Sequence, residues 1–174
     1  MEEFGLATVT PARARVVRDF AASELFDRTF QEGMELVEAT AAYLDGSGRQ
    51  ESKLLSRGAA LAYASLSMQL TTRLMQVASW LLVQRAVREG DMTPDEACQS
   101  RYRLNERPPQ REAEGEEAEA LPAGLTALAQ QAERLYERVR HLDRRMYLEA
   151  PAEEAPNPVL SQFERLRSAF DGLQ

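Results

Sequence analysis

Apolar side chains recur along most of the chain with alternating spacings of four and three residues, the pattern of a helix face that packs against other helices. The first such series is Val16, Phe20, Ser23, Asp27, Phe30, Met34, Val37, Ala41 and Leu44. It predicts a helix from about Ala12 or Ser23 to Asp45. Gly46 and Gly48 follow, and glycine readily adopts the left-handed conformation that ends many helices.

A second helix is predicted from about Ser52 to Glu89, before Gly90. Large apolar residues recur in it every seven positions, at Leu54, Leu61, Met68, Met75 and Leu82. Small residues recur with an offset of four, at Gly58, Ser65, Thr72, Ser79 and Ala86. Small residues let helix backbones approach while large ones interlock, so we interpret this seam as core packing rather than as an adaptable binding groove.

The opposite face of the same predicted helix is also apolar from Leu66 onward. A helix that is apolar on both sides must be covered on both sides. In a chain of 174 residues, a second copy of the chain is the simplest second cover. We therefore predict a homodimer whose interface is formed by Leu66, Leu70, Leu74, Val77 and Leu81.

Only a short turn separates these two predicted helices, so we expect them to form an antiparallel hairpin. If the chain turns near Gly48, Asp27 lies level with Arg73. We predict an ion pair across the hairpin between Arg73 and either Asp27 or Glu24. The alternative is that these charges simply reach solvent.

The remaining helices begin with clear signals. Thr93, Pro94 and Glu96 have the spacing of a capping box with proline at the first helical position, which predicts a short helix to about Arg103. A third long helix is predicted from about Pro122 to Tyr147, with the same apolar spacing at Leu121, Leu125, Leu128, Ala132, Leu135, Val139, Leu142 and Met146.

The placement of proline supports a helical fold throughout. The chain holds no proline between Pro11 and Pro94 or between Pro122 and Pro151, and proline is the residue that breaks helix interiors. Alternating runs of β-branched residues, which are typical of strands, are absent from the sequence. The predicted fold class is therefore all-α, an antiparallel three-helix bundle with long helices.

Two segments have the composition of flexible connections rather than of a core. Residues 105–124 include six glutamates and predict an acidic linker; residues 149–174 predict a flexible tail that carries a short amphipathic helix. The predicted domains are thus a bundle over residues 1–148, which includes the linker 105–124, and the tail over 149–174. The apolar stripe of the tail is the candidate partner-binding site, unless it packs back on its own bundle: Val159, Phe163, Leu166 and Phe170.

The chemistry of the sequence favours binding over catalysis. A single cysteine, Cys98, and a single histidine, His141, exclude a Cys/His zinc cluster, and no phosphate-binding loop or nucleophile motif is present. We predict no catalytic residue, no metal, no cofactor and no enzyme activity. The net charge of -7 disfavours nucleic acid as a partner. Because the sequence shows neither a secretory signal nor an apolar run long enough to span a bilayer, we expect a cytoplasmic protein without membrane insertion.

Several strings of the second predicted helix resemble one protein family. They are Glu51 to Arg57 (Glu-Ser-Lys-Leu-Leu-Ser-Arg), Leu70 to Gln76 (Leu-Thr-Thr-Arg-Leu-Met-Gln) and Ala78 to Leu82 (Ala-Ser-Trp-Leu-Leu). Together with the preceding string from Glu35 to Gly46, they resemble the alphaproteobacterial RcdA family, the regulators of CtrA degradation. The resemblance extends over about Phe30 to Met92.

This resemblance implies a non-enzymatic adaptor of the ClpXP protease that acts in cell-cycle control. Family members are dimeric three-helix bundles that join a protease primed by the receiver-domain protein CpdR and tether substrates such as CtrA. In that family, CtrA also requires the cyclic-di-GMP-binding protein PopA. The resemblance leaves open whether the protein is located at a cell pole. The alternative is a dimeric helical scaffold that binds receiver-domain proteins without a direct role in proteolysis.

Overall fold

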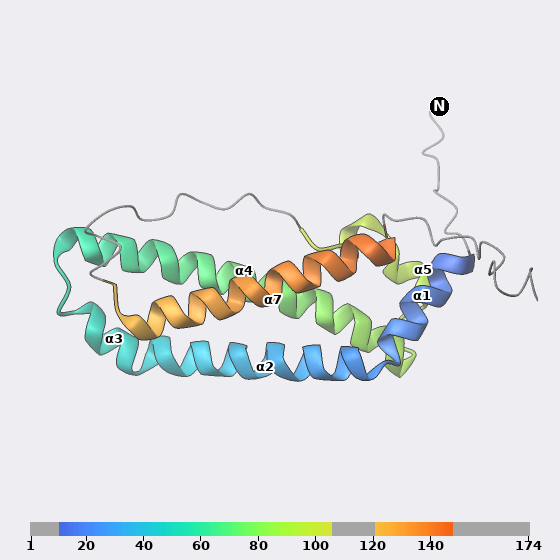
Figure 1. The fold of residues 1–174 in the computed structure, drawn as a ribbon, viewed down its shortest axis with the longest axis horizontal. Helices are drawn as coiled ribbons and strands as arrows, with labels where there is room; N and C mark the ends of the chain where they lie inside the picture. The colour runs from blue at the N-terminus through green and yellow to red at the C-terminus, as the bar shows by residue number, and fades with distance from the viewer. Residues whose placement is uncertain (1–10, 106–120, 148–174) are drawn as a thin grey trace, which may run out of the picture.

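A computed structural model describes residues 11–105 and 121–147 and confirms the all-α class over these residues. Its elements are α1 (Pro11–Ala21), α2 (Glu24–Asp45), α3 (Ser47–Ser52), α4 (Arg57–Glu89), α5 (Pro94–Ala97), the 3-10 turn η1 (Ser100–Tyr102) and α7 (Ala123–Tyr147). The three long helices α2, α4 and α7 form the bundle, with α3 at one end and α1 and α5 at the other (Figure 1). Among the described helices, none is both long and apolar enough to cross a membrane.

The first predicted helix is two helices in the structure. The break falls at Ser23, whose backbone is extended and whose hydroxyl accepts a hydrogen bond from the backbone N–H of Phe26. Serine is favoured at this N-cap position because its oxygen satisfies an amide that the helix itself cannot. A single helix from Ala12 to Asp45 is therefore wrong, whereas the alternative start at Ser23 agrees with α2, which begins at Glu24 and ends at Asp45.

α2 ends at Asp45 as predicted, but the glycines that follow do not adopt the expected left-handed conformation. Gly46 has φ of -103°, outside the left-handed region, and its N–H donates to the carbonyls of Ala42 and Tyr43. The left-handed glycine cap instead ends α4, where Gly90 has φ of 83°. This conformation carries no steric penalty for glycine.

The predicted register of the hairpin is also wrong. Asp27 pairs with Arg88, and Arg73 pairs with Glu133 on α7 at 3.1 Å. The cause is the connection between α2 and α4, where α3 and residues 53–56 continue the chain beyond Gly48 before α4 begins. Asp27 therefore meets the far end of α4 rather than its middle. Glu24 pairs with Arg28 on its own helix.

The core lies where α2 and α7 both pack on α4. Its largest fully buried side chains are Trp80, Tyr136, Phe26, Leu70, Leu81, Leu125 and Leu135. Gly33 brings α2 close to this core, because a Cβ at this position would lie 2.7 Å from Leu81 Cδ1 and 3.8 Å from Leu135 Cδ2. A methyl group there would force the end of the Leu81 side chain to shift within a packed core.

The capping box at Thr93 is confirmed. The Thr93 hydroxyl accepts from the N–H of Glu96, and the Glu96 carboxylate accepts from the N–H of Thr93. The helix it opens is shorter than predicted, since α5 ends at Ala97 and residues to Arg103 continue as η1 and an extended segment. The third long helix agrees with its prediction to within one residue at its start.

Candidate interaction surface

The seam of large and small residues on α4 is exposed, contrary to the prediction that it packs in the core. Leu61 and Met68 are both 68% exposed, Met75 is 65% and Leu82 is 52% exposed. Between Gly58 and Ala86 this face carries no charged residue. We call these four residues, with the small residues between them, the α4 seam; Leu54 of the predicted series lies before α4, in the connection from α3. Contiguous apolar surface of this kind marks an interaction site.

The predicted dimer face lies in the core of the monomer instead. Leu70, Leu74, Val77 and Leu81 are each at most 5% exposed, and Leu66 packs against the same core. These side chains are covered by the chain's own helices, so they have no surface to offer to a second copy. The two faces differ in polarity: the seam carries Ser65, Thr72 and Ser79 between its large residues, whereas the series Leu66, Leu70, Leu74, Val77 and Leu81 is apolar, which favours burial of the second series.

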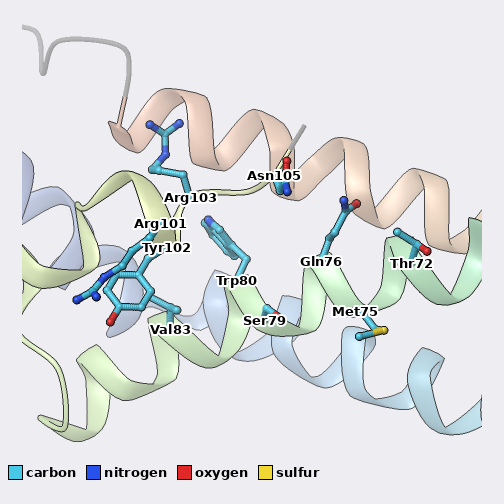
Figure 2. A pocket seen from close by; sticks show the side chains of 10 residues that line it. All are labelled: Thr72, Met75, Gln76, Ser79, Trp80, Val83, Arg101, Tyr102, Arg103 and Asn105. Atoms are coloured by element: carbon cyan, nitrogen blue, oxygen red, sulfur yellow. The ribbon is translucent and has the colours of Figure 1, made fainter. Parts of the chain in front are cut away.

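A cleft of about 460 Å³ lies along one edge of the seam. On the α4 side it is lined by Thr72, Met75, Gln76, Ser79, Trp80 and Val83. The facing wall is the segment after α5, with Arg101, Tyr102, Arg103 and Asn105. Figure 2 shows Trp80 between α4 and the segment that carries Arg103 and Asn105. The seam and the cleft are therefore continuous through Met75 and Ser79.

The wall of the cleft is held in place by Asp143 of α7, which is 2% exposed. Its carboxylate accepts from the indole N–H of Trp80 at 2.9 Å and from the backbone N–H of Leu104 at 3.2 Å. The Arg103 guanidinium donates to both of its oxygens. A buried carboxylate is tolerated only when it is paired and hydrogen-bonded in this way, so this network fixes the segment 103–105 on the bundle.

The same network reaches the end of α7. The guanidinium carbon of Arg103 lies 4.8 Å from the ring centroid of Tyr147, the last residue of α7, and the Tyr147 hydroxyl accepts a hydrogen bond from Gln84 at 2.9 Å. Burial raises the pKa of Tyr147, so it stays a neutral phenol across the physiological range. The end of α7 is thus joined through Arg103 to the wall of the cleft.

One polar atom in the cleft lacks a partner among the described residues. Gln76 Oε1 is buried and accepts no hydrogen bond there. Gln76 lines the cleft, but this oxygen is itself closed off from solvent, so a bound molecule reaches it only if the side chain turns. The open surface of the cleft therefore combines apolar side chains with an exposed guanidinium at Arg101.

Cys98 and His141, the single cysteine and the single histidine of the chain, lie in different settings. Cys98 follows α5 and is half-buried; burial raises the pKa of its thiol, which disfavours the nucleophilic thiolate at neutral pH. His141 is exposed on α7. Within residues 11–105 and 121–147, no group of three or more acidic, cysteine or histidine side chains could hold a metal ion.

The sequence analysis missed the cleft wall, although α7 contains a signal for it. Asp143 stands next to Leu142 and between Val139 and Met146, on the apolar face of the helix. An acid at a core position requires a cationic partner, and Arg103 is that partner. The predicted partner-binding residues Val159, Phe163, Leu166 and Phe170 lie outside the described residues, as do the linker over 106–120 and the tail.

Comparison with known proteins finds one family and a close solved relative. Residues 17–170 match the family model described as "Protein of unknown function (DUF1465)". The crystal structure of RcdA from Caulobacter crescentus is similar to this chain at 65% sequence identity and a TM-score of 0.63. The match covers 76% of this chain and 99% of that chain. No curated protein matches the chain significantly.

Proposed function

The chain belongs to the DUF1465 family and to the family of RcdA, and from this membership we propose that it is a non-enzymatic adaptor that tethers regulatory substrates to the ClpXP protease. The observation that carries the proposal is the 65% identity to RcdA over 99% of that chain. The substrates are CtrA-like transcription regulators, and the protease is primed by CpdR. PopA joins when CtrA is the cargo.

The surfaces of the bundle support a binding role. The α4 seam offers apolar area for a protein partner, and the cleft beside it offers mixed apolar and polar contacts. An adaptor of this kind needs no reacting group. It raises the local concentration of a weakly bound substrate at the protease to about millimolar when the tether is short, and this alone increases the rate of degradation.

The test of this proposal is reconstituted degradation. CtrA is incubated with ClpXP, CpdR, PopA and cyclic-di-GMP, with and without this protein. Faster degradation that depends on this chain supports the adaptor. No acceleration by a folded protein contradicts it and leaves the alternative, a dimeric scaffold that captures receiver-domain proteins without changing proteolysis.

We assign the tail a share of partner binding through Val159, Phe163, Leu166 and Phe170. A chain truncated after Tyr147 keeps the whole described bundle, so it should remain folded by circular dichroism. It should nevertheless fail to deliver at least some cargo. The matched control is the full chain with the four tail residues changed to serine, which keeps the length of the tether. Unchanged delivery by both variants contradicts this role.

We assign the homodimer contact to the part of the α4 seam that lies outside the cleft, around Leu61 and Met68. The heptad spacing of its large residues and the small residues between them suit helix pairing between two copies. Met68→Glu should convert the dimer to a monomer in light scattering, because it places a charge in an apolar interface. The matched control is Leu25→Glu, since Leu25 is also an exposed apolar residue, at 53%, but lies on α2 outside the seam. A dimer that survives Met68→Glu contradicts the assignment.

A further inference from the structure

We infer that the cleft between α4 and residues 101–105 is a docking groove for this chain's own C-terminal segment, residues 158–173. The contact is within one chain and competes with partners for the apolar stripe of that segment. It goes beyond the proposed adaptor role, because it concerns where the segment lies before any partner binds.

The place where the tail begins is the first argument. Tyr147 is the last described residue of α7, and its ring contacts Arg103, which lines the cleft. The tail therefore starts within one side chain of the cleft wall. Residues 148–157 can span up to about 33 Å when extended, whereas the α4 side of the cleft, from Thr72 to Val83, is about 16 Å long. The connection easily reaches the whole groove.

The apolar pattern of the segment matches that of the groove. Val159, Phe163, Leu166, Phe170 and Leu173 have alternating spacings of four and three residues, which place them on one face of a helix. The α4 seam has the same spacing, and Met75, its large residue that lines the cleft, is 65% exposed. Two helical faces with this period pack against each other along their length.

Charge also favours this occupant. Residues 148–174 carry five acidic residues and two arginines, and three of the acids, Glu149, Glu153 and Glu154, precede the apolar stripe. Near the start of the tail the bundle presents exposed Arg101 and the arginines of the last turn of α7, Arg144 and Arg145. The acidic stretch is thus attracted to the end of the bundle from which the groove runs.

The docked segment and a second copy of the chain use different parts of α4. The cleft extends from Thr72 to Val83, so Leu61 and Met68 of the seam stay open to a second copy. In the proposed adaptor cycle, a partner that binds the segment must first displace it from the groove.

Photo-crosslinking of the full chain tests the contact. The photoreactive phenylalanine analogue p-benzoylphenylalanine replaces Phe163, and the purified chain is irradiated in dilute solution without any partner. Mass spectrometry of the digest should find crosslinks to residues 72–83 and 101–105. Met75→Glu in the same chain should reduce their yield at least fivefold. Leu25→Glu is the matched control, since Leu25 is also an exposed apolar residue, at 53%, but lies on α2 outside the cleft and the seam, and the yield should not change.

Three results would each overturn the inference: crosslinks elsewhere on the bundle, no crosslink in a folded chain, or a crosslink yield that Met75→Glu does not change. A mixture of isotope-labelled and unlabelled chains separates the two sources of the segment: crosslinks that join the two labels show docking between chains and overturn the contact proposed here. No protease is present, so failure of the adaptor proposal leaves this result unaffected, and the reverse also holds.

Discussion

Both faces of α4 carry large apolar residues at helical spacing, yet one is buried and the other is exposed. One face holds Leu70, Leu74, Val77 and Leu81, which are almost fully buried, and the other holds Leu61, Met68, Met75 and Leu82, which are more than half exposed. Burial of each large apolar side chain is favourable by roughly 1.5–3 kcal/mol. The comparison shows that the first face stabilises the monomer. The second face can contribute a similar free energy only when another surface covers it.

The largest effect is expected at the polar edge of the buried face. Asp143→Ala removes the acceptor of Trp80 and the partner of Arg103, and it leaves a partly buried cation unpaired. We expect a loss of about 3–5 kcal/mol in the free energy of unfolding, measured by urea denaturation. Glu133→Ala, which breaks the partly exposed pair with Arg73, should cost less than about 1 kcal/mol. Equal costs would show that the network around Asp143 does not stabilise the fold.

Neighbouring leucines provide the sharpest test of the two faces. Leu81 is fully buried and Leu82 is half exposed, although they are adjacent and chemically identical. Leu81→Ala should destabilise the monomer by about 2–5 kcal/mol because it leaves a cavity. Leu82→Ala should change monomer stability by no more than about 0.5 kcal/mol. Urea denaturation of both variants, each measured in dilute solution, decides whether the assignment of faces is correct.

Gly33 tests how tightly α2 is packed on the buried face. A methyl group at this position meets Leu81 Cδ1, so Gly33→Ala should destabilise the fold by about 1–3 kcal/mol in thermal or urea unfolding. In the double variant with Leu81→Ala the two costs should be less than additive, because the smaller side chain makes room for the methyl group. Strict additivity would mean that the two residues do not touch.

The smallest effect is expected at the N-terminus of α5, the short helix that follows α4. Thr93→Ala should cost about 1 kcal/mol through loss of the N-cap of α5. Hydrogen bonds from Thr93 lower the pKa of Glu96 below its ordinary value of 4.5, so the contribution of this carboxylate is complete above that value. It is lost as pH falls through the lowered pKa of the folded state. The melting temperature of Glu96→Gln should therefore differ from that of the parent at neutral pH and converge with it in acid.

The sequence predicts the helices well because their signals are local. Ser23, Thr93 and Gly90 each mark a helix end through the backbone groups they satisfy, and those groups lie within four residues. The spacing of Leu125, Ala132 and Leu135 likewise predicts which face of α7 is buried. Since α7 is apolar on one side only, its orientation has a single solution.

The faces of α4 and the cleft depend on contacts that the sequence does not display. Both sides of α4 have helical apolar spacing, so periodicity alone cannot show which side the other helices cover. Ser65, Thr72 and Ser79 were the available clue, because hydroxyl groups are better tolerated in water than in a core. The pairing of Arg103 with Asp143 joins residues 40 positions apart and creates the cleft wall, and it follows only from the tertiary structure.

The position of Trp80 gives the molecule a built-in optical reporter. It is the only tryptophan of the chain, and it contacts the core, the Asp143 carboxylate and the cleft at once. When it is excited at wavelengths where tyrosine does not absorb, the fluorescence therefore comes from one site, which belongs both to the core and to the lining of the cleft. A shift of emission on adding a partner, without loss of helical signal, would report occupancy of the cleft in a label-free titration.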